Sequence, residues 1–439
     1  MNRLCVQIFL GKQWHDAAEI SFDKPEAGHQ GATKLDYLAP FVIDHMHAPN
    51  SAGAVLSCRY PVDFTSHTEA QWPAFLLDLL PGGEGRRRWA KRLNISTGLS
   101  GEFELLKHAS ANPVGNLRIK EAAAYQSKIS STLPDSGGEL QPINEHPGFS
   151  KAEIINKQEG FIEYAYQRGA AVSGATDVQG EAPKFLLVRD TQDRWHAEGA
   201  ISDSKIRDHW IVKFPRGKKP ADTKVLKNEA PYLEVARQFQ LKVAKPLELH
   251  EQALFIPRFD RLQKDGRTVR LAVESLYSVA GIAHFGQAAS HEQLCQALMA
   301  HTAPDKHYAT ALEYIKRDIL NTVMGNTDNH GRNTAILRNR TGDCELSPLF
   351  DFAPMYLDPE GIARVTRWDK DKEHAGRPNW KAVVNFFEPW ANTQQLERDL
   401  NPLTEALQQL DKTMHALGID QDIITRCSKA SQTALQTLR

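Results

Sequence analysis

The chain has 439 residues, too many for one hydrophobic core of ordinary size, and this length predicts two or three domains. Its formal net charge is −1 at pH 7, so bulk electrostatics do not indicate nucleic acid as a direct partner. The five cysteines are scattered and form no Cys-x-x-Cys pair, which argues against a zinc site and a disulfide framework. No run of about 18 apolar residues occurs, so we expect a soluble cytoplasmic protein without a membrane partner.

The first 125 residues predict a small unit of helices and strands. Residues 1–22 have the pattern of a hairpin that turns at Gly11-Lys12. Apolar residues recur at helical spacing over 72–80, and a basic helix is expected after the break at Pro81-Gly82-Gly83. A short strand at 117–119 completes this unit. Residues 126–150 are partly rich in Ser, Pro and Gly and predict an exposed linker.

Strand patterns dominate the next segment, 151–260. Small residues precede a predicted strand at 185–188, where a backbone could approach a phosphate group closely. A glycine-rich surface turn is the commoner alternative for such a pattern. The candidate phosphate-contacting residues in this stretch are Ser173, Gly174, Gly180 and Lys184.

A lone lysine, Lys213, lies inside the apolar strand predicted at 210–215. A lysine there must either extend its ammonium group to solvent or meet an anion. The alternative is an edge strand on which the lysine prevents aggregation. A helix is predicted over 229–240, with Asn228 as its N-cap and Pro231 in its first turn. Glu229 would then either complement the helix dipole or pair with Lys213.

The last segment, 261–439, begins with a hairpin predicted to turn at Asp265-Gly266 and is mostly helical from residue 291 onward. One apolar-faced helix, predicted over 311–324, ends at Gly325. A strand-rich segment followed by a helix-rich segment is the organisation of a protein kinase.

The loop after Gly325 carries the residues expected to perform chemistry. Asp328 and Asn333 lie five residues apart on it, and Asp351 follows two short predicted strands. This set suits phosphoryl transfer, because the first Asp can accept a hydroxyl proton while the Asn and the second Asp supply hard oxygen ligands for Mg²⁺. The alternative is an ordinary turn, since Asn, Asp and Gly dominate turns.

Taken together, these residues resemble the HipA family of bacterial serine/threonine kinases, known mainly as toxins of toxin–antitoxin pairs. The catalytic-loop signature of that family, Asn-x-Asp-x-His-x-x-Asn, is matched at residues 326–333. Further matches are the metal-binding Asp351, the strand Lys213, the Asn228-Glu229 pair, the hinge-like Arg-Phe-Asp-Arg at 258–261, and Leu-Leu-Pro-Gly at 79–82.

The resemblance implies an α+β, two-lobed, protein-kinase-like fold with an additional small N-terminal α+β subdomain. The implied division is a HipA-like subdomain (1–125), a linker (126–150), a strand-rich ATP-binding lobe (151–260) and a helical catalytic lobe (261–439). Asp328 would be the catalytic base, and Asn333 and Asp351 would hold Mg²⁺. ATP would contact Lys213, which pairs with Glu229, and backbone groups near Ile256 and Phe259.

One part of the sequence departs from the family pattern. Members usually carry a compact run similar to Ser-Gly-Ala-Gln-Pro-Lys, whereas residues 176–182 here separate Ser173-Gly174-Ala175 from Pro183-Lys184. Ser173 is the nearest match to the inhibitory autophosphorylation site of the family. In the hinge, Pro257 replaces an acidic residue that is common among relatives.

The function expected from this resemblance is ATP- and Mg-dependent transfer of the γ-phosphate to a serine or threonine of a protein, with autophosphorylation. Aminoacyl-tRNA synthetases are targets of relatives and offer one class of protein substrate. The implied partner is a helix-turn-helix antitoxin, through which DNA would be contacted indirectly. The alternatives are a small-molecule kinase and a non-catalytic nucleotide-binding scaffold that represses transcription together with such an antitoxin.

Overall fold

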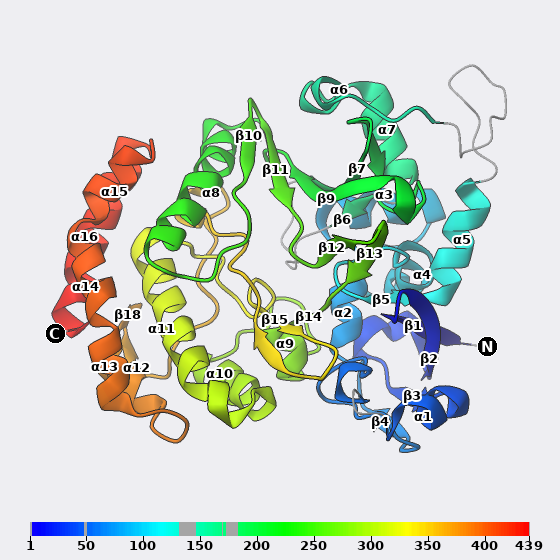
Figure 1. Ribbon diagram of the computed structural model, residues 1–439, viewed down its shortest axis with the longest axis horizontal. Helices are drawn as coiled ribbons and strands as arrows, with labels where there is room; N and C mark the ends of the chain where they lie inside the picture. Colours follow the sequence, from blue (N-terminus) through cyan, green and yellow to red (C-terminus); the bar gives the residue numbers. More distant parts are fainter. Residues whose placement is uncertain (1, 48–50, 131–145, 169, 173–182, 439) are drawn as a thin grey trace.

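The computed structural model describes residues 2–47, 51–130, 146–168, 170–172 and 183–438. Three of the candidate phosphate-contacting residues, Ser173, Gly174 and Gly180, lie outside the described residues. The N-terminal sheet and the C-terminal helices lie at opposite ends of the long axis, with a second sheet between them (Figure 1).

The N-terminal subdomain is built on an antiparallel sheet with the strand order β4-β3-β2-β1-β5. Its first hairpin turns at Gly11-Lys12, where both residues have positive φ (55° and 79°), as the predicted tight turn requires. The strands are β1 (Arg3–Leu10), β2 (Gln13–Phe22), β3 (Thr33–Tyr37), β4 (His67–Glu69) and β5 (Leu117–Ile119). Both the predicted hairpin and the predicted strand at 117–119 are therefore confirmed.

Helices pack against this sheet through a core that includes Trp72 and Phe103, whose rings each lie 5.1 Å from that of Phe22. They are α1 (Ala39–His45), α2 (Phe75–Leu79), α3 (Gly83–Leu93), α4 (Leu99–Ala109) and α5 (Lys120–Ser130). The predicted basic helix is α3. Helix α5 extends to Ser130, into the stretch expected to be a linker, and residues 131–145 lie outside the described residues.

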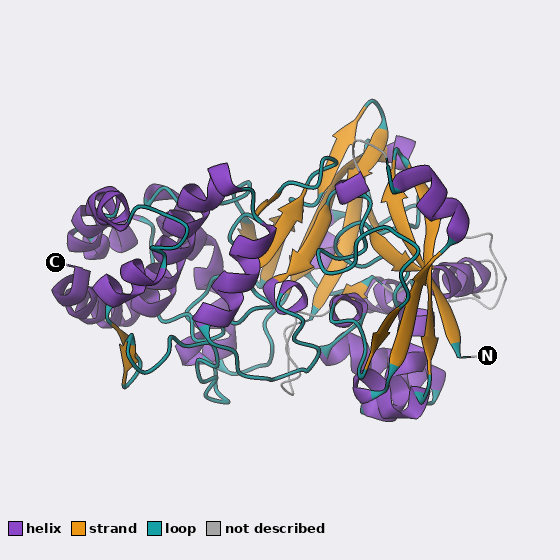
Figure 2. Ribbon diagram, turned by 90° about the horizontal axis from the view of Figure 1, so that it is seen from below, coloured by secondary structure: helices purple, strands orange, loops and turns teal. Residues whose placement is uncertain are grey.

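The strand-rich lobe contains an antiparallel sheet with the order β10-β11-β9-β7-β6, and β8 also pairs with β7. The strands of the molecule are visibly twisted (Figure 2). The strands of this sheet are β6 (Ala171–Val172), β7 (Lys184–Asp190), β8 (Trp195–Ala197), β9 (Ile206–Lys213), β10 (Glu248–His250) and β11 (Ala253–Pro257). Strand β9 lies between β7 and β11. The edge-strand explanation for Lys213 is therefore wrong.

Helices α6 (Lys151–Ile155), α7 (Glu159–Gln167) and α8 (Pro220–Gln238) belong to the same region. The predicted start of a helix at Glu229 is wrong, because α8 begins nine residues earlier, at Pro220, and continues through Pro231. Proline is well placed at the first position, and Asp222 accepts a hydrogen bond from the Lys219 amide, so the helix has its own N-terminal signal there. Asn228 is not an N-cap, since its side chain donates to the Lys224 carbonyl within the helix.

The remaining residues form the helical lobe. It contains a hairpin of β12 (Arg261–Lys264) and β13 (Arg267–Arg270), which turns at Asp265-Gly266 as predicted. It also contains a small sheet of β14 (Ala272–Ser275), β15 (Ala335–Arg338) and β16 (Cys344–Leu346). The helices are α9 (Leu276–Val279), α10 (His291–His301), α11 (His307–Met324), α12 (Trp380–Phe386), α13 (Thr393–Asp399), α14 (Asn401–Gln408), α15 (Leu410–Ala416) and α16 (Gln421–Leu438). A short hairpin, β17 (Glu373–His374)–β18 (Arg377–Pro378), lies between them.

Buried apolar side chains gather in three clusters, one in the N-terminal subdomain, one in the strand-rich lobe and one in the helical lobe. The α8 residues Tyr232, Val235 and Ala236 belong to the third cluster, so this helix joins the strand-rich sheet to the helices. The α+β architecture expected from the sequence is confirmed. Within the described part of the chain, no helix is both long and apolar enough to cross a membrane.

Candidate functional site

A cluster of buried charges lies where the strand-rich sheet meets the helical lobe. Lys213, at the end of β9, donates to Glu229 Oε2 at 2.6 Å and to Asp351 Oδ1 at 2.7 Å. Lys184, the residue opposite Lys213 on β7, donates to Asp351 Oδ2 at 2.9 Å. Of the two alternatives that the sequence left for Lys213, solvent or an anion, the structure shows the second, with two carboxylates as partners. Glu229 pairs with Lys213 from the interior of α8 rather than from a helix end.

The backbone fixes Asp351 in an uncommon conformation. Its φ is +52°, which is uncommon for a residue other than glycine, although aspartate tolerates it better than most. Burial alone disfavours the charged carboxylate, but Lys184 and Lys213 outweigh it and hold the pKa of Asp351 well below its usual range. Asp351 therefore presents an ionised carboxylate at neutral pH.

The loop predicted to carry the chemistry follows α11, which ends at Gly325 with φ +71° as the sequence predicted. Asn326 anchors the loop by donating to Asn321 Oδ1 on that helix at 2.8 Å. Asn333 then folds back, and its Nδ2 donates to the Asp328 carbonyl at 2.8 Å and to Asp328 Oδ2 at 3.3 Å. The two side chains that lie five residues apart in the sequence therefore meet.

The environment of Asp328 gives its carboxyl an unusual proton affinity. Burial, followed by the charge of Asp351, raises its pKa to about 7, although Lys184 and Lys213 act in the opposite direction. At neutral pH this carboxyl is therefore close to its titration midpoint, which is where a general base is most effective.

His330 lies beside Asp328 in a neutral form. Burial and the nearby Arg332 lower its pKa to about 4. Its Nδ1 accepts a hydrogen bond from the Arg332 amide, so the proton of the neutral ring is on Nε2, 3.5 Å from Asp328 Oδ1. The ring also stacks on Tyr277. These contacts fit a side chain that holds the loop in place.

The charged cluster and Asn333 line a cavity of about 210 Å³ between the lobes, whereas Asp328 and His330 are not among the residues that line it. Its polar end includes Lys184, Lys213, Asn333 and Asp351. Its apolar wall includes Ile211, Val243, Leu247, Ile256, Phe259 and Leu349. Ile256 and Phe259, which were predicted to contact adenine, therefore line the same cavity as the charged cluster, and the Phe259 and Phe350 rings lie 5.9 Å apart. A flat apolar group fits one end and an anion the other.

The donor set at the polar end fits a hard divalent cation. Within the described part of the chain, the Asn333 side chain forms its hydrogen bonds through Nδ2, which leaves the amide oxygen available there as a ligand. Together with the ionised Asp351 it supplies the oxygen donors that Mg²⁺ prefers.

The N-terminal subdomain contributes a residue that the sequence did not reveal. Asp78, on α2, accepts from Arg332 of the loop at 2.8 Å and from the Ser275 hydroxyl and amide at 2.9 Å and 3.1 Å. Arg332 also packs over the Phe285 ring. Asp78 immediately precedes the Leu-Leu-Pro-Gly motif, which was the one available signal. The subdomain thus holds the loop that carries Asp328.

Asp78→Ala is expected to lower the free energy of unfolding by about 3 kcal/mol, because it leaves the guanidinium of Arg332 buried without its carboxylate. Chemical denaturation of the full chain measures this change. Asp44→Ala, an exposed position on α1 of the same subdomain, is the matched control and should change stability by less than about 0.5 kcal/mol. Equal losses in the two variants would contradict the assigned role of Asp78.

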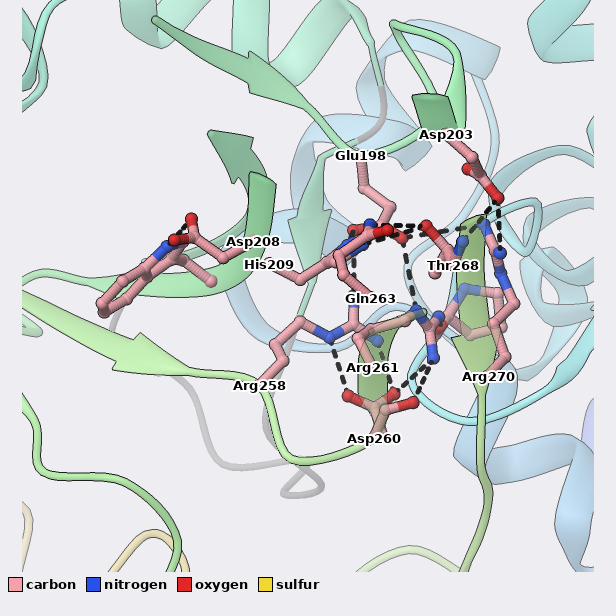
Figure 3. Close-up of polar contacts among 12 residues, drawn as sticks. Glu198, Asp203, Asp208, His209, Arg258, Asp260, Arg261, Gln263, Thr268 and Arg270 are labelled. Carbon is pink, nitrogen blue, oxygen red and sulfur yellow. Dashed lines mark hydrogen bonds and ion pairs between the residues drawn. The ribbon is translucent and has the colours of Figure 1, made fainter. Parts of the chain in front are cut away.

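The hinge-like Arg-Phe-Asp-Arg motif lines the cavity through Arg258, Phe259 and Asp260, and its charged residues have a second role. Arg258, Asp260 and Arg261 are buried in an ionic network that also includes Glu198 (Figure 3). Asp260 accepts from the Gly115 amide at 2.8 Å, and Arg261 donates to the Gly115 carbonyl at 2.7 Å. These charged side chains therefore tie the strand-rich lobe to the N-terminal subdomain.

Comparison with known proteins supports both the fold and the family. A HipA-like C-terminal domain model matches residues 176–417, more than half of the chain, and a HipA N-terminal domain model matches residues 19–120. Among curated proteins, none matches the sequence.

Two solved structures show similarity of different strength. HipA of Shewanella oneidensis MR-1, solved in complex with HipB and operator DNA, is 19% identical over 99% of this chain and 96% of its own, with a TM-score of 0.63. The proinflammatory kinase CtkA of Helicobacter pylori is 14% identical over 53% of this chain and 90% of its own, with a TM-score of only 0.33. The first match confirms the two-lobed, kinase-like α+β fold with its N-terminal subdomain. With one domain model covering more than half of its length and a second covering the N-terminal subdomain, the chain belongs to the HipA family.

Proposed function

We propose that this protein is an ATP- and Mg-dependent serine/threonine protein kinase that transfers the γ-phosphate of ATP to a protein hydroxyl. The observation that carries the proposal is the arrangement at the cavity between the lobes. Around this cavity lie a cluster of lysines and carboxylates, the loop that carries Asp328 and Asn333, and an apolar wall. The pKa of Asp328 on that loop is about 7.

In the proposed mechanism, the apolar wall near Ile256 and Phe259 receives the adenine, and Lys184 and Lys213 pair with phosphate oxygens. Asn333 and Asp351 would hold Mg²⁺, which would offset the negative charge of the phosphates. Asp328 orients the serine or threonine hydroxyl of the substrate and accepts its proton. The hydroxyl oxygen forms a bond to the γ-phosphorus as the bond to the β-phosphate oxygen breaks, so that ADP leaves.

A partner is also proposed. The Shewanella HipA structure contains HipB and operator DNA, and the present chain has the same fold along nearly its whole length. We therefore infer a DNA-binding antitoxin as partner, with DNA contacted through it. Aminoacyl-tRNA synthetases are the substrate class proposed from the family resemblance.

Transfer of labelled γ-phosphate from ATP in the presence of a cell lysate tests the proposed activity. The protein is expected to label serine or threonine residues with Mg²⁺ present and to lose this activity when the metal is chelated, because Asn333 and Asp351 then lack the cation they are proposed to hold. Asp328→Ala should bind ATP without transferring phosphate. Absence of transfer by the unmodified protein, despite measurable ATP binding, would contradict the proposal.

The pH dependence of transfer is expected to follow Asp328. Its carboxyl accepts a proton only when ionised, so kcat/KM should fall about tenfold per pH unit below about 7 and level off above it. His330 has a pKa of about 4, so its titration should not change kcat/KM in this pH range. ATP affinity measured over the same range separates the titration of ATP from that of the enzyme. A flat profile between pH 5.5 and 8 would exclude Asp328 as the base.

A further inference from the structure

A second large pocket lies away from the cavity between the lobes. It encloses about 680 Å³ and is lined by β5 and α5 of the N-terminal subdomain and by the segment that follows β8. Among the described residues, it shares no lining residue with the cavity that contains Lys213 and Asp351. The side chains of Arg118, Lys120 and Arg270 line it.

Arg118 is the positively charged residue of this pocket on which the argument for an anion depends. Its Nε donates to Gln7 Oε1 at 2.6 Å, and its guanidinium lies 4.0 Å from the centre of the Trp14 ring. No carboxylate of the described residues forms an ion pair with it. Burial and the nearby charge of Arg270 lower its pKa to about 10, so it stays charged at neutral pH. Two like charges are thus held together with the outer nitrogens of Arg118 unpaired.

Two carboxylates, Glu198 and Asp203, also line the pocket, but the shorter ion pairs of Glu198 are with residues outside it. Glu198 contacts Arg258 at 3.2 Å, Arg261 at 3.4 Å and His209 at 3.0 Å (Figure 3). It approaches Arg270 only at 3.9 Å, and Asp203 does so at 3.7 Å. Lys120 is held by Asp16, while Arg118 has no equivalent partner. The positive charge facing the pocket is therefore incompletely balanced.

We propose that this pocket is a binding site for a small phosphate-bearing anion. A guanidinium presents a planar fork of donors that matches a phosphate group, and Arg118 is pre-oriented for this contact by Gln7 and Trp14. Arg270 and Lys120 add charge on either side. The volume exceeds that of a single phosphate ion, which points to a ligand with two or more phosphates or with a further organic group. The site is independent of the proposed kinase activity.

Calorimetric titration of the full chain with inorganic pyrophosphate, in the absence of nucleotide, tests the site. Arg118→Gln keeps a side-chain amide near Gln7 but removes the charge, and it should weaken binding at least about tenfold. Lys120→Gln, an exposed change that leaves the core untouched, should weaken binding about threefold. Lys184→Met removes a proposed phosphate contact of the other cavity, so it should leave the component of pyrophosphate binding that depends on Arg118 within about twofold.

The outcomes separate this site from the nucleotide cavity. Loss of binding in Lys184→Met with retention in Arg118→Gln would place the anion in the nucleotide cavity and overturn the proposal. So would a lack of binding by the unmodified protein at millimolar pyrophosphate, or unchanged affinity in both pocket variants. Retained ATP binding by Arg118→Gln verifies that this variant is folded, and the readout does not depend on phosphoryl transfer.

Discussion

Asp328→Asn is expected to abolish phosphoryl transfer while making the folded protein more stable. The amide cannot accept the proton of the attacking hydroxyl, and removal of a general base of this kind typically lowers the rate by about 10²- to 10⁴-fold. The same amide is neutral, so it avoids the burial and the repulsion from Asp351 that the carboxylate experiences. Its oxygen can still accept from Asn333, so the loop geometry is retained.

The direction of the stability change follows from the pKa. Folding raises the pKa of Asp328 from its ordinary value of 3.8 to about 7, so the folded state binds this proton more tightly than the unfolded state. The resulting destabilisation is absent below pH 3.8, grows as the pH rises toward 7 and is complete above it. A difference of this size corresponds to at most about 4 kcal/mol. The gain in the variant should therefore be largest at pH 8 and nearly absent at pH 4.

Urea unfolding of both proteins at pH 4, 6 and 8 measures this gain, and labelled phosphate transfer measures the loss. Asp44→Asn, an exposed position on α1, is the control and should change neither property. A variant that transfers phosphate at the original rate would remove Asp328 from the mechanism. One that loses transfer but is less stable at pH 8 would show that the raised pKa is not a property of the folded protein.

Local sequence patterns predicted much of this site because several of its residues lie close together in the sequence. The loop from Asn326 to Asn333 is compact, and its capping glycine, Gly325, follows a strongly amphipathic helix, so the meeting of Asp328 and Asn333 follows from local geometry. The pairing of Lys213 with Glu229 could be proposed because a lysine in an apolar strand either reaches solvent or meets an anion, and Glu229 is a nearby carboxylate in the sequence.

Contacts across long stretches of chain could not be predicted in this way. Asp78 and Arg332 are 254 residues apart, and their pairing depends on how the N-terminal subdomain docks on the helical lobe. The predicted start of α8 is wrong because Pro231 is typical of the first turn of a helix. In the structure, buried neighbours stabilise the helix around that proline. The two lysines that hold Asp351, which itself has a left-handed conformation, likewise come from 167 and 138 residues earlier in the chain.

Lys213→Met should destabilise the protein by about 3 to 5 kcal/mol at pH 8, because it leaves the buried Glu229 without its only hydrogen-bond partner among the described residues. Burial of Lys213 opposes its charge, but Asp351 and Glu229 raise its pKa above the ordinary value of 10.5. The titration of Lys213 itself therefore removes this stabilisation only as the pH rises above 10.5. Burial also raises the pKa of Glu229, so this carboxyl can take up a proton in the variant, and the loss should be smaller at pH 5.

The double variant Lys213→Met/Glu229→Gln separates stability from activity. Replacing Glu229 by a neutral amide removes the uncompensated charge, so most of the lost stability should return. Phosphoryl transfer should not return, since the proposed contact between the ammonium group and the phosphates is still missing. Urea unfolding and labelled phosphate transfer on the single and double variants measure the two properties, with Lys34→Met on β3 as an exposed lysine control. If the double variant regained both, Lys213 would act only as a partner of Glu229, and the phosphate contact would have to be assigned to Lys184.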